Sequence, residues 1–518
     1  MMCLAQPSTA AWVDPLTPEE RQGRNLYNNG KDRFSDHVAI NLQGVEGGIP
    51  ATLFRCAGCH GYRGEGSQEG GLRVPPLIPS ALRRAREGTS AGRSRAGYTD
   101  EALARAITQG IDASGHALQA SMPRFQLPPD QVAKLIAYLN RIGDESDTDP
   151  GVSSDVVTIG AALPLTGPLA QIGRDVTAIM RGALRRVNEQ GVYGRRIELV
   201  VEDSRGEPAQ TAQAVSRLID IHQVFALVGT FEPAGNTHIR ERLEQDQIPS
   251  IFPLTQSPQL SDPPDRSQFY ALPGFDLQFR SLVDFLASRT MPLTGTSQPR
   301  LALVHRNGDS NNDALRGVLE QVRRHGLNVA VNYEYSPGRL AVLALVAQLE
   351  QQEIDAVVFL GDGEDLVSVA HELGRRRLSP IVLSAIGMVG PQALAVPPAL
   401  LSRIFLVTPI APPTEREVTN LRALSGQSSL ASIGFARMAQ GAVSLLAESL
   451  KQAGRRLNRQ AIIDALEACR EQDTGAGFSV TYGVHRRLGR VASQIVGLMP
   501  DPPYVSPLTG WMVPEGEP

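Results

Sequence analysis

A pentapeptide in the first quarter of the chain has the residue types and the spacing for one specific chemistry. Two residues separate Cys56 from Cys59, and His60 follows the second cysteine directly. In a C-x-x-C-H motif the two thiols add to the vinyl groups of a haem, and the adjacent imidazole becomes a ligand of its iron. Only 4 of the 518 residues are cysteine, so a match by chance has a frequency of about one in a thousand. The motif therefore predicts one covalently bound haem c.

Two other kinds of site use cysteines at this spacing, a redox-active dithiol and half of a zinc site. A zinc site needs a second pair of cysteine or histidine ligands nearby, and the sequence around 56–60 offers none. A thioredoxin-like dithiol lies next to a βαβ pattern, which this region lacks. Haem attachment is the interpretation that these residues favour.

Two predicted amphipathic helices would position this motif. The first spans 18–28 and contains Gly23 and Tyr27, whose spacing suits packing against another helix. The second spans 130–141 and carries aliphatic residues on one face, with a tyrosine beside them. The loop before the second helix contains Met122, whose thioether sulfur is a soft metal ligand.

In their order along the chain, the first helix, the pentapeptide, Met122 and the second helix resemble a class I cytochrome c domain, a small all-α fold, over residues 16–143. The resemblance implies that Met122 is the sixth ligand of the iron and that a backbone carbonyl near Pro75 or Pro76 orients His60. His/Met ligation raises the reduction potential above that of two histidines. The resemblance is carried by the helix with Gly23 and Tyr27, Cys56–Gly61, Pro75–Leu77, Met122–Pro123 and Ala137–Leu139.

Two alternatives remain open for the distal side of this haem. Met122 as an ordinary core methionine is one, and His116 as the distal ligand is the other. The chain also departs from the family between Tyr27 and Cys56, where the spacer is far longer than usual. We expect this insert, Asn29 to Phe54, to cap the haem edge or to form part of a partner surface.

An acidic segment rich in small residues, 143–151, ends in Pro-Gly and has the composition of a linker. It predicts domains at 15–143 and 154–518, joined by a linker at 144–153. Residues 1–14 are expected to be a leader remnant or disordered, because they lack the basic and apolar regions of a signal peptide. Haem c is attached outside the cytoplasm, so we expect a periplasmic protein whose signal peptide is truncated or missing from this sequence.

Short apolar segments alternate with helical patterns throughout the second region. A first series has strands at 156–163, 197–202 and 225–228, and a second begins at 301–304 after a Pro/Ser/Thr-rich break at 289–299. Buried strands that alternate with helices are typical of parallel sheets covered on both faces. We therefore expect an α/β fold with two lobes and a cleft between them.

This region resembles the type I periplasmic solute-binding proteins of the branched-chain amino-acid class. The matching segments are Ile159–Pro168, Val228–Thr230, Ile248–Pro253, Ile354–Val358 and 477–498. In such folds the ligand binds where loops at the carboxyl ends of strands meet across the cleft. An ordinary turn or loop role is the alternative for each candidate residue. The candidate ligand-binding residues are Thr166, Gln171, Phe231, Glu232, Thr255, Gln256, Asn311 and Asp362.

Three positions depart from the amino-acid-binding members of that class. Pro233 and Gln256 stand where those proteins have a small hydroxyl residue and a threonine. The acidic residue that receives the ligand's ammonium group falls near Ile386. An amino-acid zwitterion would leave both of its charges poorly paired, which is costly in a buried site. We expect a small neutral or aromatic ligand instead.

Composition and motifs argue against two further classes of function, nucleic-acid binding and catalysis. The net charge of -4 does not favour a nucleic-acid partner. No nucleophile elbow, metal triad or phosphate-binding loop accompanies the haem motif, so we expect no enzyme. A haem peroxidase, the enzyme alternative, needs an open sixth position, which Met122 argues against.

The favoured hypothesis is a periplasmic electron carrier with a small-molecule-binding module. Its redox partner would be a periplasmic dehydrogenase, of the quinoprotein type, or a terminal oxidase chain. The alternatives are a solute receptor for an ABC permease with a cytochrome appendage, and a ligand or redox sensor.

Overall fold

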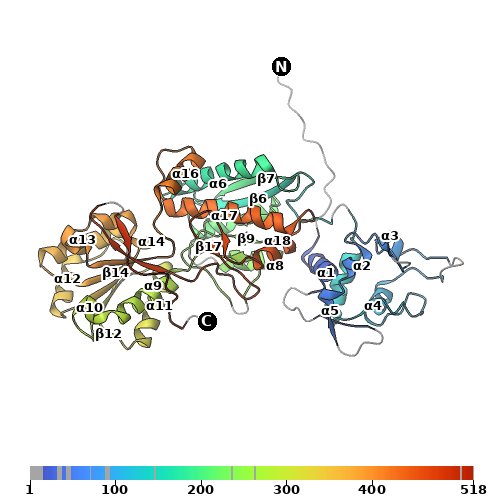
Figure 1. Cartoon of the computed structure of the whole chain (residues 1–518), viewed down its shortest axis with the longest axis horizontal. Coiled ribbons are helices and arrows are strands. Elements are labelled where there is room, and N and C mark those ends of the chain that lie inside the picture. The colour runs from blue at the N-terminus through green and yellow to red at the C-terminus, as the bar shows by residue number, and fades with distance from the viewer. Residues whose placement is uncertain are drawn as a thin grey trace, which may run out of the picture. The chain divides into compact units, whose positions relative to one another are not determined.

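The computed structural model describes residues 16–31, 38–42, 48–69, 72–87, 94–144, 147–234, 237–261, 264–501 and 504–516. The chain divides into two units, one up to Val152 and one from Ser153 onward (Figure 1). The predicted leader segment at 1–14 lies outside the described residues.

Two crossing helices, α1 (Pro18–Asn29) and α5 (Pro129–Leu139), form the frame of the first unit. Gly23 allows them to approach closely, because a Cβ at this position would overlap the backbone of α5. The rings of Tyr27 and Tyr138 meet edge to face beside this crossing, with centroids 5.6 Å apart. The two helices and their contact agree with the pattern in the sequence. The shorter helices are α2 (Cys56–His60), α3 (Pro79–Leu82) and α4 (Asp100–Thr108).

Two small antiparallel sheets supplement this helical frame. The insert before the pentapeptide supplies β1 (Ala39–Asn41) and β2 (Ile49–Pro50), and β1 also pairs with β5 (Arg124–Gln126). A hairpin of β3 (Ser67–Glu69) and β4 (Leu72–Val74) follows the pentapeptide. The first unit therefore contains short strands in addition to the helices of the all-α fold that we expected.

The acidic segment that we expected to be a linker packs in part against the first unit. Asp149 is 1% exposed and forms an ion pair of 2.6 Å with the buried Arg24. Asp147 accepts a hydrogen bond of 2.9 Å from the Tyr138 hydroxyl and lies 3.7 Å from the same guanidinium. Asp149 is buried and Asp147 half-buried because α1 and α5 provide partners for them, so the described part of 144–152 belongs to the first unit.

The second unit begins with a five-stranded parallel sheet in the order β10-β9-β8-β6-β7. Its strands are β6 (Val156–Leu163), β7 (Arg196–Asp203), β8 (Ala226–Val228), β9 (Ser250–Ile251) and β10 (Gln268–Phe269). β6 is almost entirely apolar and buried, as expected of a central parallel strand. The helices of this first lobe are α6 (Ala170–Gln190), α7 (Pro208–Asp220), α8 (Thr237–Asp246), α16 (Glu415–Ser425), α17 (Ile433–Ala453) and α18 (Arg459–Glu467).

A seven-stranded sheet, in the order β12-β11-β13-β14-β15-β18-β19, forms the second lobe. The first five strands are mutually parallel, whereas β18 and β19 are antiparallel to their neighbours. Separate apolar clusters cover the two faces of this sheet. The strands are β11 (Arg300–Arg306), β12 (Asn328–Tyr335), β13 (Ala356–Leu360), β14 (Ile381–Ala385), β15 (Ile404–Thr408), β18 (Gln494–Leu498) and β19 (Val505–Pro507), and the helices include α9 (Phe275–Ser288), α11 (Asp309–Arg324), α12 (Val342–Gln351), α13 (Gly363–Arg375) and α14 (Ile386–Val389).

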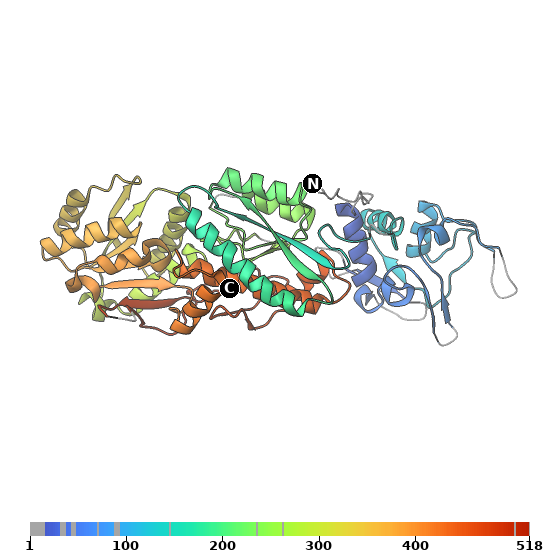
Figure 2. The same cartoon turned by 90° about the horizontal axis from the view of Figure 1, so that it is seen from above.

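The chain leaves the first lobe after β10 and returns to it after β15. Figures 1 and 2 show the returning helices, in orange and red, beside the teal α6. Gly182 of α6 makes the contact with α16 possible, because a Cβ there would overlap the carbonyl of Leu424. This crossing pattern produces the two-lobed α/β architecture that the sequence predicted.

Candidate functional site

Helix α2 consists of the pentapeptide itself. Cys56 and Cys59 lie three residues apart, which places both side chains on one face of a single turn. Cys56 is half-buried and Cys59 is exposed. The Tyr27 hydroxyl donates a hydrogen bond of 2.7 Å to the carbonyl oxygen of Gly61, the residue that ends the helix. The frame helix α1 thus fixes the end of the motif that carries His60.

A backbone carbonyl orients the His60 ring. Its Nδ1 lies 2.9 Å from the oxygen of Pro75, so Nδ1 carries the proton and Nε2 keeps a lone pair for a metal. Burial lowers the pKa of His60, which keeps the imidazole neutral at neutral pH. This is the contact that the resemblance to class I cytochromes implies.

The two distal candidates differ in their surroundings. Met122 is half-buried and packs against the apolar core of the first unit, as does Cys56. His116 is exposed, and its Nδ1 lies 3.4 Å from the carboxylate of Asp112, which also accepts a hydrogen bond from the His116 backbone. The imidazole of His116 is thus held within its own loop. These surroundings favour Met122 over His116 as the distal ligand.

The donor set of the first unit fits a covalently attached haem. Two thiols share one helix face, a neutral imidazole has a fixed tautomer, and a thioether borders the same apolar core as Cys56. Cys56 and Cys59 would bind the porphyrin, and His60 and Met122 its iron. The haem supplies one-electron chemistry when bound.

The predicted ligand-binding residues of the first lobe follow the carboxyl ends of β6, β8 and β9, but several have partners within the lobe. The Thr166 hydroxyl donates a hydrogen bond of 2.6 Å to Asp203. The Gln171 amide donates one of 2.7 Å to the buried Asp175. Thr255 accepts a hydrogen bond from the Ser257 backbone. These side chains organise their own loops.

Glu232 has an unusual environment for a carboxyl group. It is 7% exposed and accepts weak hydrogen bonds of 3.3 and 3.4 Å from the Gln268 amide, which in turn accepts one from the Tyr270 hydroxyl. No ion pair of Glu232 occurs among the described residues. Burial raises the pKa of Glu232 to about 8, so the group is mainly protonated at neutral pH. The sequence singled out Glu232 but gave no signal for Gln268 or Tyr270.

Two further candidates contact segments that are distant in the sequence. The ring of Phe231 lies against that of Phe435, in the first turn of α17, with centroids 6.0 Å apart. The amide nitrogen of Gln256 lies near Gly387 of α14, where a Cβ would be 3.5 Å away. Sequence reasoning missed Phe435 and Gly387, because no local pattern reports which helix returns to a given strand end.

Asn311 and Asp362 of the second lobe are held by their neighbours. The Asn311 amide donates a hydrogen bond of 2.8 Å to the carbonyl oxygen of Arg306. Asp362 caps α13 and forms an ion pair of 2.6 Å with the Arg306 guanidinium. No single hydrogen-bonded cluster of the described residues unites the eight candidates, and their role in ligand binding stays a prediction.

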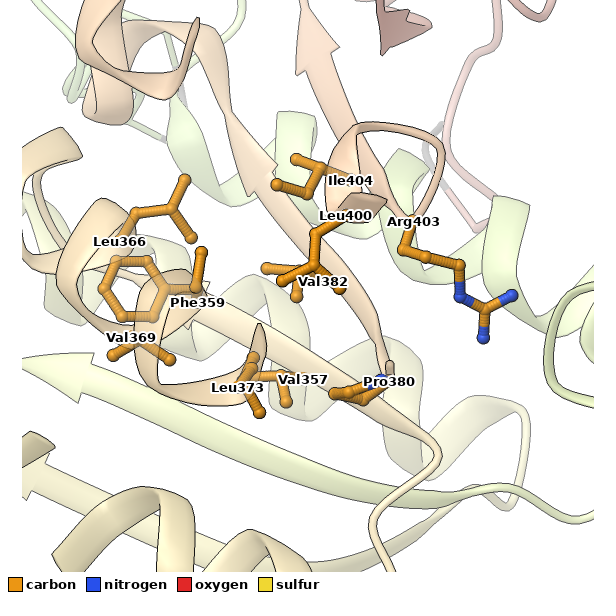
Figure 3. Close-up of a pocket in the computed structure, with 11 residues that line it drawn as sticks. Val357, Phe359, Leu366, Val369, Leu373, Pro380, Val382, Leu400, Arg403 and Ile404 are labelled. Atoms are coloured by element: carbon orange, nitrogen blue, oxygen red, sulfur yellow. The ribbon is translucent and has the colours of Figure 1, made fainter. Parts of the chain in front are cut away.

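Two cavities of the second lobe are not lined by any of the eight candidates. One, of about 330 Å³, lies at the amino ends of β13 and β14, opposite the edge where we expect the ligand, and its lining includes Asp355, Ser379 and Arg403. The other, of about 10 Å³, is an apolar space between α13 and the sheet, lined by side chains such as Phe359 and Leu366 (Figure 3). The smaller cavity has room for no more than about one water molecule.

One group of potential metal ligands lies outside these sites. His325 is 2.6 Å from a carboxylate oxygen of the buried Asp284, and the Glu515 backbone donates to the other oxygen. Gln321 adds a further hydrogen bond to Asp284. Because the Asp284 oxygens are already occupied, this group anchors the C-terminal segment to α9 and α11. Separately, the described residues include no helix with the length and apolar character to cross a membrane.

Comparison with known families agrees with both halves of this architecture. Residues 156–495 match the model of the periplasmic binding protein family, and residues 51–142 match that of cytochrome c. The Leu/Ile/Val-binding protein BraC3 of Rhizobium johnstonii is 23% identical over 329 residues, which cover 63% of this chain and 87% of that protein.

Solved structures give the same result for the fold. The fatty acid ABC transporter substrate-binding protein from Thermomonospora curvata matches with a TM-score of 0.58 and 22% identity, over 71% of this chain and 95% of that one. A branched chain amino acid ABC transporter from Thermus thermophilus with bound valine matches with a TM-score of 0.57 and 17% identity. The match covers 70% of this chain and 97% of that one. Since the family match covers more than half of the chain, this protein belongs to the periplasmic binding protein family and carries a cytochrome c domain ahead of its binding-protein domain.

Proposed function

We propose that this protein is a periplasmic electron carrier with a single haem c, fused to a module that binds a small neutral or aromatic solute. The observation that carries the proposal is the hydrogen bond of 2.9 Å between His60 Nδ1 and Pro75, next to two thiols on one helix turn. A histidine with only a packing role would not need one ring nitrogen kept unprotonated beside two such thiols. The cytochrome c and binding-protein families are typical of the periplasm, which supports the location.

The residues around the motif favour electron transfer over chemistry on a substrate. His60 and Met122 would both bind the iron of a haem held here, which would leave no open site for peroxide and would raise the reduction potential. The Tyr27 hydroxyl and the Pro75 carbonyl hold the proximal segment in place. A proximal segment held in this way would let a bound haem gain and lose single electrons with little rearrangement.

The carboxyl groups beside the candidate residues of both lobes favour a ligand without an ammonium group. An ammonium needs a free carboxylate, but Asp203 already accepts hydrogen bonds from Thr166 and the Arg205 backbone. Asp362 is paired with Arg306, and Glu232 is mainly neutral at pH 7, since its pKa is about 8. By contrast, the Phe231 and Phe435 pair offers aromatic surface. The relatives named for branched-chain amino acids thus share the fold, and we infer a different ligand class here.

A periplasmic dehydrogenase, of the quinoprotein type, is the redox partner that we propose. It would donate electrons to the haem while the binding module holds or senses its substrate. The alternative is a solute receptor for an ABC permease, which the family match over 156–495 favours. Both roles use the same binding module and differ in what the haem contributes.

Two measurements on the full-length holoprotein test this proposal. Stopped-flow mixing with a reduced quinoprotein dehydrogenase should reduce the haem rapidly, whereas slow reduction by every dehydrogenase tried would reject that partner. Thermal-shift screening with alcohols, aromatic compounds and amino acids should give stabilisation by a neutral or aromatic compound. Stabilisation by leucine or valine alone would overturn the inferred ligand class.

A further inference from the structure

We propose that the strands β1 and β2, together with Arg124, form a brace that keeps Met122 in position as an iron ligand. The inference rests on the proposed ligation by Met122. It goes beyond that proposal because it assigns a positioning role to residues that are not among the proposed haem or iron ligands.

The path of the chain gives the first argument. β2 runs through the short 3-10 helix Ala51–Leu53 almost directly into α2, which carries the thiols and His60. β5 begins two residues after Met122. β1 pairs with both of these strands, Ile40 opposite Ile49 on one side and opposite Phe125 on the other. One three-stranded sheet therefore connects the segment before the proximal ligand to the segment after the distal one.

The side chains of this sheet are anchored on the same apolar core. Ile40 is fully buried and Phe125 is 4% exposed, and both belong to the cluster against which Met122 and Cys56 pack. The Gln126 amide donates a hydrogen bond of 2.9 Å to the side-chain oxygen of Asn41, across β1 and β5. Strands of two or three residues have little stability of their own, so these anchors fix their register.

Arg124 provides a second hold on the loop that carries Met122. Its guanidinium donates hydrogen bonds to the backbone oxygens of Met122 and of Leu118, which lie at the two ends of residues 118–122. Gly110, with a φ of 72°, provides the space, because a Cβ there would overlap this guanidinium. Only the fork of an arginine bonds two carbonyls at once in a fixed plane, whereas a lysine presents a point charge.

The brace has a chemical consequence. A soft thioether is a modest ligand, and an added ligand such as imidazole can replace it whenever the loop opens. The apparent affinity for the added ligand rises in proportion to the open fraction. Weakening the brace should therefore increase the affinity for imidazole by about tenfold or more, lower the reduction potential and diminish the methionine–iron absorption band of the oxidised haem.

The experiment compares five variants of the full-length holoprotein by imidazole titration, redox titration and absorption spectroscopy. Arg124→Ala and Ile40→Ala weaken the brace, and Arg124→Lys keeps the stem and charge but loses the fork. Met122→Ala removes the proposed ligand. The matched control is Arg83→Ala, since Arg83 also donates to a backbone carbonyl of this unit, that of Tyr98, and its other partners, Asp100 and Asn140, likewise lie outside residues 118–122.

The brace predicts tighter imidazole binding and a lower potential in both alanine variants of the brace, a smaller change in Arg124→Lys and none in Arg83→Ala. Wild-type behaviour of Arg124→Lys and Ile40→Ala, with a lost absorption band in Met122→Ala, would overturn the brace while leaving the ligand in place. An unchanged band in Met122→Ala would instead reject the ligation itself. If Arg124→Ala fails to fold, Arg124→Lys and Ile40→Ala decide the question.

Discussion

Replacing Glu232 with glutamine should remove much of the pH dependence of stability in the first lobe of the second unit. Glu232 is buried against the neutral Gln268 amide, and desolvation raises its pKa from 4.5 to about 8, with the Asp265 carboxylate adding to the rise. A carboxyl group with a raised pKa binds its proton more tightly in the folded state. Its contribution to stability is therefore complete below about pH 4.5 and is lost as the pH rises to about 8.

The difference between the two pKa values sets the size of the effect. At about 1.4 kcal/mol for each pH unit, ionisation of Glu232 costs at most about 5 kcal/mol once the pH exceeds 8. Glutamine has nearly the shape of the protonated acid and cannot ionise. The Glu232→Gln variant should match the parent protein at acidic pH and exceed its stability by up to this amount at alkaline pH.

Calorimetric unfolding across this pH window is the assay, with the haem absorbance used to separate the transition of the first unit from that of the second. Glu241→Gln is the matched control, because Glu241 is an exposed glutamate on the neighbouring α8, with a side chain 68% exposed. The control should show the parent profile. If the free energy of unfolding depends on pH in the same way in the parent and in Glu232→Gln, whether the two curves coincide or differ by a constant, the argument is refuted.

Three further predictions concern packing and the binding surface. Arg24→Ala should remove the ion pair with the buried Asp149 and destabilise the first unit by about 3–5 kcal/mol, measured as the urea midpoint of the haem absorbance. Gly23→Ala should cost about 1–3 kcal/mol in the same assay, because the added methyl group overlaps α5, and full stability would contradict the helix crossing. Phe435→Ala should weaken binding of an aromatic ligand about tenfold in a thermal-shift titration, without altering the haem spectrum, and unchanged binding would exclude the pair with Phe231 from the site.

The parts of the fold that the sequence predicted are those coded by local spacing. The helix expected at 18–28 is α1, and the strand expected at 156–163 is β6 with the same bounds. The spacing of Gly23 and Tyr27 could be interpreted because two residues four positions apart lie on the same face of a helix. The alternation of strands and helices predicted the lobes, since parallel strands require crossover helices.

The features that escaped prediction depend on partners far away in the chain. Asp149 looked like part of an acidic linker because its cation, Arg24, lies 125 residues earlier. β1 and β5 are three residues long, too short for a period to be recognised, and they pair across the whole first unit. Gln268, which contacts Glu232, is likewise 36 residues away. Burial and charge pairing of this kind are tertiary properties without a local pattern.

The central claim, a covalent His/Met haem that transfers single electrons, is tested most directly by spectroelectrochemical titration of the purified full-length chain. The account predicts that haem remains attached after denaturation and that its absorbance follows one wave with the slope of a one-electron couple. It also predicts that Met122→Ala shifts the wave to lower potential. A chain without covalent haem, whose only redox wave is the two-electron couple of a Cys56–Cys59 dithiol, would contradict the account.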